Sequence, residues 1–77
     1  MSVWEDCRMT LQRVNTKLSY HGKTTLVIRS GYGKVGVDDA NFNSNISPLM
    51  TRRQLLLWLE AFEAGLDYAN GESEVTL

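Results

Sequence analysis

Residues 31–36 read GYGKVG and match the pattern G-x-G-x-x-G, which in dinucleotide-binding proteins holds a pyrophosphate. That chemistry needs a strand that turns into a helix, because the first amides of the helix bind the phosphates. Here valine, glycine, valine and two aspartates follow the lysine of the turn, and these residues are poor helix formers. The match therefore indicates a turn between two strands rather than a nucleotide site.

A second stretch with possible chemistry is DANFNSN, residues 39–45, which places oxygen ligands at alternate positions as a calcium loop does. The sixth position holds Ser44 where the loop needs glycine, and the twelfth holds Met50 where it needs a bidentate glutamate. The single histidine, His21, falls in an expected turn, and Cys7 has no histidine nearby in the sequence. We therefore predict a protein with no metal, no cofactor and no enzymatic activity.

Length and composition favour one small domain that spans residues 1–77. Of these residues 43% are hydrophobic and 22% are charged, which is ordinary for a folded globular chain. A single cysteine excludes an internal disulfide, and the sequence has no apolar run of membrane-spanning length and no signal-peptide pattern. We expect a cytoplasmic protein that does not contact a membrane.

Two turn signals predict β-hairpins in the middle of the chain. Gly31 and Tyr32 are placed at the centre of a type II′ turn, so Leu26 is expected opposite Val37 with the apolar side chains on one face. A loop at residues 21–23 would lead back to an earlier strand. The pattern predicts three antiparallel strands, near residues 14–20, 24–30 and 33–38.

The strongest helix signal follows Pro48. Thr51 and Gln54 form a capping box, so the helix is expected to begin at Arg52 and to stop at Asn70-Gly71. Its core stripe is predicted to consist of Leu55, Trp58, Leu59, Phe62, Leu66 and Ala69. A second capping box, from Ser2 to Glu5, predicts a short N-terminal helix, although the residues from Met9 onward also fit an extension of the first strand. The predicted fold is α+β, a three-stranded antiparallel meander covered on one face by the C-terminal helix.

Charge is distributed unevenly along the chain. Residues 7–37 hold six basic and no acidic residues, whereas the residues after Arg53 carry only acidic charges. In the predicted register the basic side chains of the sheet point away from the helix, with Arg29 directly opposite Lys34. Such a face is either simply solvated or binds an anionic partner. We interpret Glu60, Glu63 and Asp67 as the solvated side of the helix.

Two arginines at the start of the C-terminal helix oppose its dipole. We expect them either to pair with Asp38 or Asp39 or to contact an anion. The candidate partner-binding residues are therefore Lys17, Arg29, Lys34, Arg52 and Arg53.

A further surface consists of apolar and small residues beside the core stripe of the C-terminal helix. Gly65 lies inside the predicted helix, where glycine costs about 1 kcal/mol relative to alanine. Its presence therefore suggests close packing against another backbone. The candidate seam of a homodimer consists of Leu57, Ala61, Gly65 and Tyr68. The alternative is that these residues widen the face buried against the sheet.

A short α-β-β-β-α chain that ends in a capped helix, TRRQLLLWLEAFEAGLDYANG, resembles the small accessory proteins encoded by bacteriophages, among them anti-CRISPR proteins and other antagonists of host defence. The resemblance implies a stoichiometric inhibitor that works in the host cytoplasm and blocks a host protein or protein–nucleic acid complex by protein–protein contact. Two alternatives are a nucleic-acid-binding protein that uses the basic sheet face, and a small-molecule (nucleotide) sponge built at a dimer interface.

Overall fold

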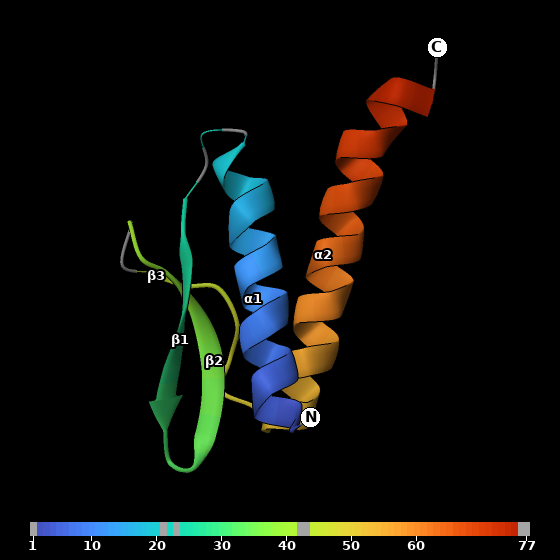
Figure 1. The fold of residues 1–77 in the computed structure, drawn as a ribbon. Coiled ribbons are helices and arrows are strands. Elements are labelled where there is room, and N and C mark those ends of the chain that lie inside the picture. The colour runs from blue at the N-terminus through green and yellow to red at the C-terminus, as the bar shows by residue number, and fades with distance from the viewer. Residues whose placement is uncertain (1, 21, 23, 42–43, 76–77) are drawn as a thin grey trace.

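The computed structural model describes residues 2–20, 22, 24–41 and 44–75. The chain forms α1 (Val3–Ser19), β1 (Leu26–Gly31), β2 (Lys34–Asp39), β3 (Ser44–Asn45) and α2 (Arg52–Val75), as Figure 1 shows. The three strands make one antiparallel sheet in the order β1-β2-β3. The α+β fold with an antiparallel meander, an N-terminal helix and a C-terminal helix is thus confirmed. His21, in the predicted turn, lies outside the described residues.

Helix α1 is much longer than the sequence indicated. Ser2 caps it as predicted, since its hydroxyl accepts a hydrogen bond from the amide of Glu5 at 3.1 Å. The helix continues to Ser19, so the predicted strand at residues 14–20 is wrong. Val14 and Leu18 are buried one helical turn apart, and the first glycine of the chain, Gly22, comes only after the helix at φ +65°. Because nothing in α1 breaks the helix before that point, the helical period prevails over the alternating one.

The hairpin between β1 and β2 forms with a register that differs by two residues from the prediction. Leu26 faces Asp39 and Ile28 faces Val37, so the same side chains point inward as expected. The turn residues are Tyr32 and Gly33, with φ values of +54° and +72°. Two positive φ values define a type I′ turn, and the predicted type II′ turn at Gly31-Tyr32 is therefore wrong.

Residues 44–50 cover the second edge of β2. The amides of Ile46 and Ser47 both donate to the carbonyl of Val37, at 2.9 and 3.0 Å. Further along, Val35 and Met50 exchange two backbone hydrogen bonds, at 2.8 and 2.7 Å. This edge of the sheet is consequently occupied along its length.

Helix α2 begins at Arg52, as the capping box predicted. The Thr51 amide donates to the Gln54 side chain at 3.0 Å, and the Gln54 amide donates to the Thr51 hydroxyl at 3.2 Å. The helix runs on to Val75, so the predicted stop at Asn70-Gly71 is wrong. Neither of the described helices is both long and apolar enough to cross a membrane.

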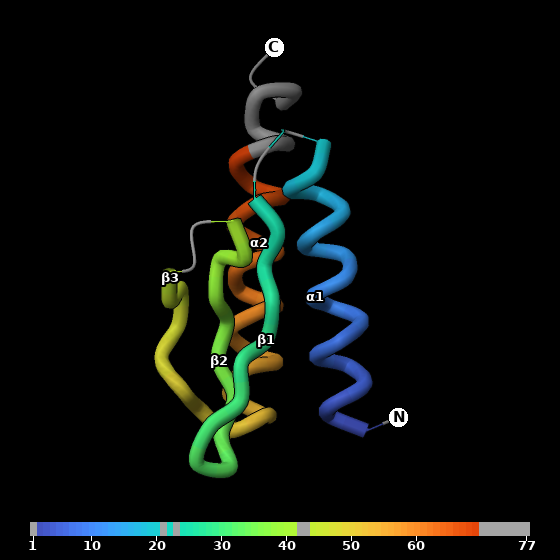
Figure 2. The backbone as a smooth tube through the Cα atoms, turned by 90° about the vertical axis from the view of Figure 1, so that its left-hand side faces the viewer, coloured from blue at the N-terminus to red at the C-terminus, as the bar shows by residue number. Residues whose placement is uncertain are grey.

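The two helices lie side by side and run in the same direction, on one face of the sheet (Figures 1 and 2). Between the layers lies a single core to which both helices and the first two strands contribute. Its buried apolar residues are Cys7, Val14, Leu18, Leu26, Val35, Val37, Leu55 and Leu59. Viewed from the sheet side, α2 lies behind the strands, while α1 stands beyond the edge of β1 (Figure 2).

Candidate functional site

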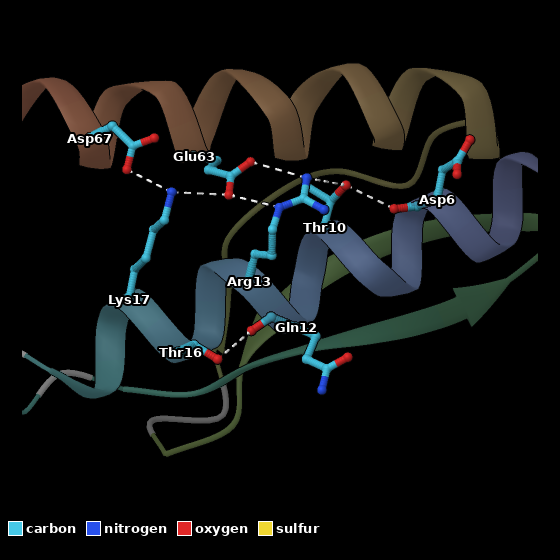
Figure 3. Close-up of polar contacts among 8 residues, drawn as sticks. All are labelled: Asp6, Thr10, Gln12, Arg13, Thr16, Lys17, Glu63 and Asp67. Atoms are coloured by element: carbon cyan, nitrogen blue, oxygen red, sulfur yellow. Dashed lines mark hydrogen bonds and ion pairs between the residues drawn. The ribbon is translucent and has the colours of Figure 1, made fainter.

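An ionic seam joins α1 and α2. Arg13 contacts Glu63 at 3.0 Å, and Lys17 contacts both Glu63, at 3.1 Å, and Asp67, at 2.6 Å (Figure 3). The acidic side of α2 is thus directed at α1 rather than being merely solvated, and Lys17 belongs to this seam. Lys17 therefore does not share the sheet face on which the sequence placed it.

Hydrogen bonding in the seam shifts the pKa values of its members. The hydrogen bond from Arg13, supported by that from Lys17, lowers the pKa of the Glu63 carboxyl despite partial burial. Hydrogen bonds to Asp67 and Glu63 raise the pKa of the Lys17 ammonium. Each charged form is stabilised by its partner across the helix pair, so the seam is a structural element.

Arg29 lies on the outer face of the sheet, as predicted, but it is not available to a partner. Its guanidinium forms an ion pair with Asp38 and donates to the carbonyl of Ser47 at 2.8 Å. It faces Gly36 rather than Lys34 across the hairpin, so the expected repulsion between two opposed cations does not arise. Arg29 fastens the segment around Ser47 to the sheet, and Asp38 is consequently not the partner of Arg52 or Arg53.

The remaining predicted cations gather at one end of the molecule. Because Val35 bridges to Met50, Lys34 lies next to the residues that open α2, where Arg52 and Arg53 follow. The hairpin turn and the start of α2 are at the same end in both views (Figures 1 and 2). We call Tyr32, Lys34, Arg52 and Arg53 the basic end.

The members of the basic end differ in how far their side chains are fixed. The guanidinium of Arg52 lies over the Trp4 ring, 4.8 Å from its centroid, which holds it beside the start of α1. Lys34 and Arg53 are exposed, and neither forms an ion pair with another described residue. Tyr32 is 98% exposed at the tip of the hairpin.

Tyr32 is unusual because its backbone and its side chain are both unfavourably placed. A tyrosine at φ +54° occupies the left-handed region, which asparagine and glycine adopt with less strain. Its ring is exposed to solvent and is absent from the hydrophobic core. The fold therefore gains nothing from an aromatic ring at this position.

The predicted dimer seam lies on the outer side of α2. Leu57 is 62% exposed and Tyr68 is 71% exposed, and Ala61 and Gly65 between them are exposed as well. A Cβ atom added at Gly65 would meet nothing within 4 Å. The alternative, that these residues are buried against the sheet, is therefore wrong.

A shallow cavity of about 650 Å³ runs along one side of α1, and all the residues that line it belong to this helix. We call its wall the α1 flank, which consists of Glu5, Arg8, Met9, Leu11, Gln12, Asn15, Thr16 and Ser19. Asn15 forms hydrogen bonds with the sheet. Its side-chain amide donates to the Leu26 carbonyl at 2.9 Å and accepts from the Leu26 amide at 2.8 Å.

Sequence reasoning missed both Asn15 and the α1 flank. A strand at residues 14–20, which the sequence predicts, hides the flank, because its members share one face only in a helix. The sequence predicts Tyr32 in a turn, but its positive φ depends on the register of the hairpin. The sequence does not determine that register, because Gly31 and Gly33 allow two different turns.

Comparison of the chain with protein-family models, with curated proteins and with solved structures found no match.

Proposed function

We propose that this protein is a non-enzymatic binding module that acts by stoichiometric contact with a macromolecular partner, and that the basic end is its contact surface. The partner is a protein that presents an acidic surface. In line with the resemblance to phage accessory proteins, we place that partner in a bacterial host, where occupation of its surface would inhibit or modulate it.

The observation that carries this proposal is the strained and exposed tyrosine at the tip of the hairpin. Tyrosine and arginine are enriched among the residues that dominate protein–protein binding energy, since both combine a large apolar area with hydrogen-bonding groups. Lys34, two residues along the chain, and Arg53, at the start of α2, add positive charge at the same end of the molecule that the described residues do not neutralise. An acidic surface is therefore the complementary partner.

The test is affinity capture from native host lysate, with four variants in two matched pairs. Tyr32→Asn removes the ring, whereas Tyr32→Phe keeps it on the same strained backbone. Lys34→Gln removes a charge, whereas Lys34→Arg keeps it. We expect the wild type, Tyr32→Phe and Lys34→Arg to retain one dominant protein in a 1:1 ratio, and the other two variants to lose it.

Nuclease treatment separates the main alternative. Capture that disappears after nuclease treatment, or a linear fall of log affinity with log salt typical of phosphate contacts, would identify nucleic acid as the partner and contradict the proposal. Equal capture by all four variants would show that the basic end is not the contact surface.

A further inference from the structure

The two edges of the sheet differ in how their backbone groups are hydrogen-bonded. Residues 44–50 cover the outer edge of β2 with backbone hydrogen bonds. On the other side, β1 is an edge strand that α1 contacts through Asn15. Among the residues that the structure describes, only Leu26 is bonded at this edge, by the side-chain amide of Asn15.

The hairpin register shows which backbone groups face that edge. In an antiparallel pair, residues that bond to the partner strand alternate with residues whose amide and carbonyl point away. Thr25 accepts from the Ala40 amide at 2.9 Å, so the odd-numbered residues of β1 bond to β2. The amides and carbonyls of Leu26, Ile28 and Ser30 therefore point outward, which agrees with the Asn15 contact to Leu26. We call the Ile28–Ser30 part the open edge, because within the described residues no counterpart of Asn15 bonds to it.

The layers are also unequal in width. Two helices side by side are about 20 Å across, whereas two full strands and the two-residue β3 span about 10 to 15 Å. The uncovered part is α1, which stands beyond the edge of β1 (Figure 2). A strand added beside β1 would continue the sheet and lie over the α1 flank.

We infer that the open edge of β1 and the α1 flank together accept an extended segment of a partner protein, which adds to the sheet as a strand. Its backbone would exchange hydrogen bonds with Ile28 and Ser30. Asn15 already takes the groups of Leu26, so it stops the added strand at that point and fixes its register.

The occupant is a bare extended segment rather than a second copy of this chain. Helix α1 already stands in the helix layer behind the position of the added strand (Figure 2). A second copy joined through its own β1, about a two-fold axis perpendicular to the sheet, would bring another α1 into the same layer. A segment without a helix meets no such obstacle.

Charge on the α1 flank indicates one side chain of the segment. Helix α1 and strand β1 run in opposite directions, and four helical residues cover about 6 Å, close to the 6.6 Å of two strand residues. Starting from the Asn15–Leu26 contact, Arg8 and Glu5 therefore lie on either side of the level of Ser30. The Ser2 hydroxyl donates to the Glu5 carboxylate at 3.4 Å, which leaves Arg8 as the charge without a side-chain hydrogen bond among the described residues. Arg8 is exposed and forms no ion pair within the described residues. An acidic residue in the segment complements it.

The probe is a capped hexapeptide of alternating valine and threonine with one aspartate, compared with the same peptide carrying asparagine. Amide hydrogen exchange and chemical-shift titration by NMR report the binding. We expect the peptide at saturation to slow exchange at Ile28 and Ser30 at least tenfold, while Arg29, whose amide bonds to β2, is unchanged. The aspartate peptide should bind several-fold more tightly than the asparagine peptide, and Arg8→Gln should remove that difference.

Two variants test the edge itself. Ser30→Pro removes an outward amide that β2 does not use, a position where edge strands tolerate proline, and should weaken peptide binding at least tenfold, whereas Ser30→Ala should not. Asn15→Ala frees the groups of Leu26, so the peptide should then protect the Leu26 amide as well.

Three results would overturn the inference: no protection of Ile28 and Ser30 at millimolar peptide, equal affinity of a folded Ser30→Pro variant, or protection of Ile28 that rises with protein concentration alone. The last result would assign the edge to a second copy. The basic end is not altered in these variants, so their outcome is independent of the proposed function.

Discussion

Gly36 and Arg29 explain the last glycine of GYGKVG without any ligand. A Cβ atom at Gly36 would lie 3.1 Å from the Arg29 guanidinium carbon and 3.0 Å from the carbonyl oxygen of Pro48. The missing side chain lets the guanidinium lie across the strand and reach Asp38 and the Ser47 carbonyl. The glycine that suggests phosphate binding in the sequence therefore makes room for an internal cation.

Replacement of Arg29 by methionine should lower the free energy of unfolding by about 1.5–3 kcal/mol, the range for hydrogen bonds to charged groups. The loss arises because Asp38 and the Ser47 carbonyl keep no partner among the described residues at this half-buried position. Urea denaturation measures it. Lys34→Met, which removes an exposed charge from the same face, is the control, and an equal effect of both variants would contradict the role assigned to Arg29.

Tyr32→Asn should raise the free energy of unfolding by about 0.5–1 kcal/mol, because asparagine adopts the left-handed conformation with less strain. Gly33→Ala should lower it by about 1 kcal/mol, since alanine at φ +72° is strained. Thermal and urea unfolding provide both values. A destabilised Tyr32→Asn variant would mean that the ring supports the fold, and the reason for regarding it as a contact residue would be lost.

At the scale of elements, the ionic seam gives the pairing of α1 and α2 a dependence on pH. The folded-state pKa of Glu63 is lowered, so its contribution to stability is fully present above the unfolded value of about 4.3. That contribution is lost as the pH falls through the folded-state value. The folded-state pKa of Lys17 is raised, so its contribution is present below about 10.4 and is lost as the pH rises through the folded-state value.

Glu63→Gln should therefore be less stable than the wild type at pH 7, and the difference should shrink as the pH is lowered toward 2. Urea midpoints measured across this range for both proteins provide the comparison. Glu60→Gln is the control, because Glu60 forms no ion pair within the described residues. A gap between wild type and Glu63→Gln that stays constant with pH would show that its ionisation does not support the seam.

The same elements show how far the sequence alone could lead. The capping boxes gave the starts of both helices, because a cap depends on residues three positions apart. The sequence predicted the hairpin with the correct side chains facing inward. Two adjacent turns fit the glycines equally well, however, and which turn forms depends on tertiary contacts such as the bridge between Val35 and Met50. Residues 14–20 have apolar side chains at both helical and alternating spacing, so their state could not be settled locally.

For the candidate site, the sequence showed where basic residues are concentrated along the chain, but it could not show which of them pair with carboxylates in the fold. Lys17 and Arg29 find acidic partners 46 and 9 residues away, respectively, and such pairs become apparent only once the elements are placed. Lys34 and Arg53 are exposed, and neither forms an ion pair with a described carboxylate. This difference from Lys17 and Arg29 also becomes apparent only in the fold.

At the scale of the whole molecule, one core connects every long element, so the chain should unfold as a unit. Leu59→Ala removes a fully buried side chain from this core and should lower the free energy of unfolding by about 2–5 kcal/mol. Tryptophan fluorescence and far-ultraviolet circular dichroism should report coincident transitions in both proteins. Separate transitions for the two signals would contradict a single cooperative core.

The parallel course of α1 and α2 also affects the order in which the chain can fold. Antiparallel neighbours can be joined by a short loop, but here the chain has to run through all three strands before α2 starts from the same end as α1. The bonds between the helices therefore close loops of 46 to 50 residues. Contacts of such long sequence separation slow folding relative to a simple helical hairpin. During synthesis on the ribosome, the apolar side of α1 cannot pack against α2 until the last third of the chain has been made. A chaperone therefore has the opportunity to bind α1 first.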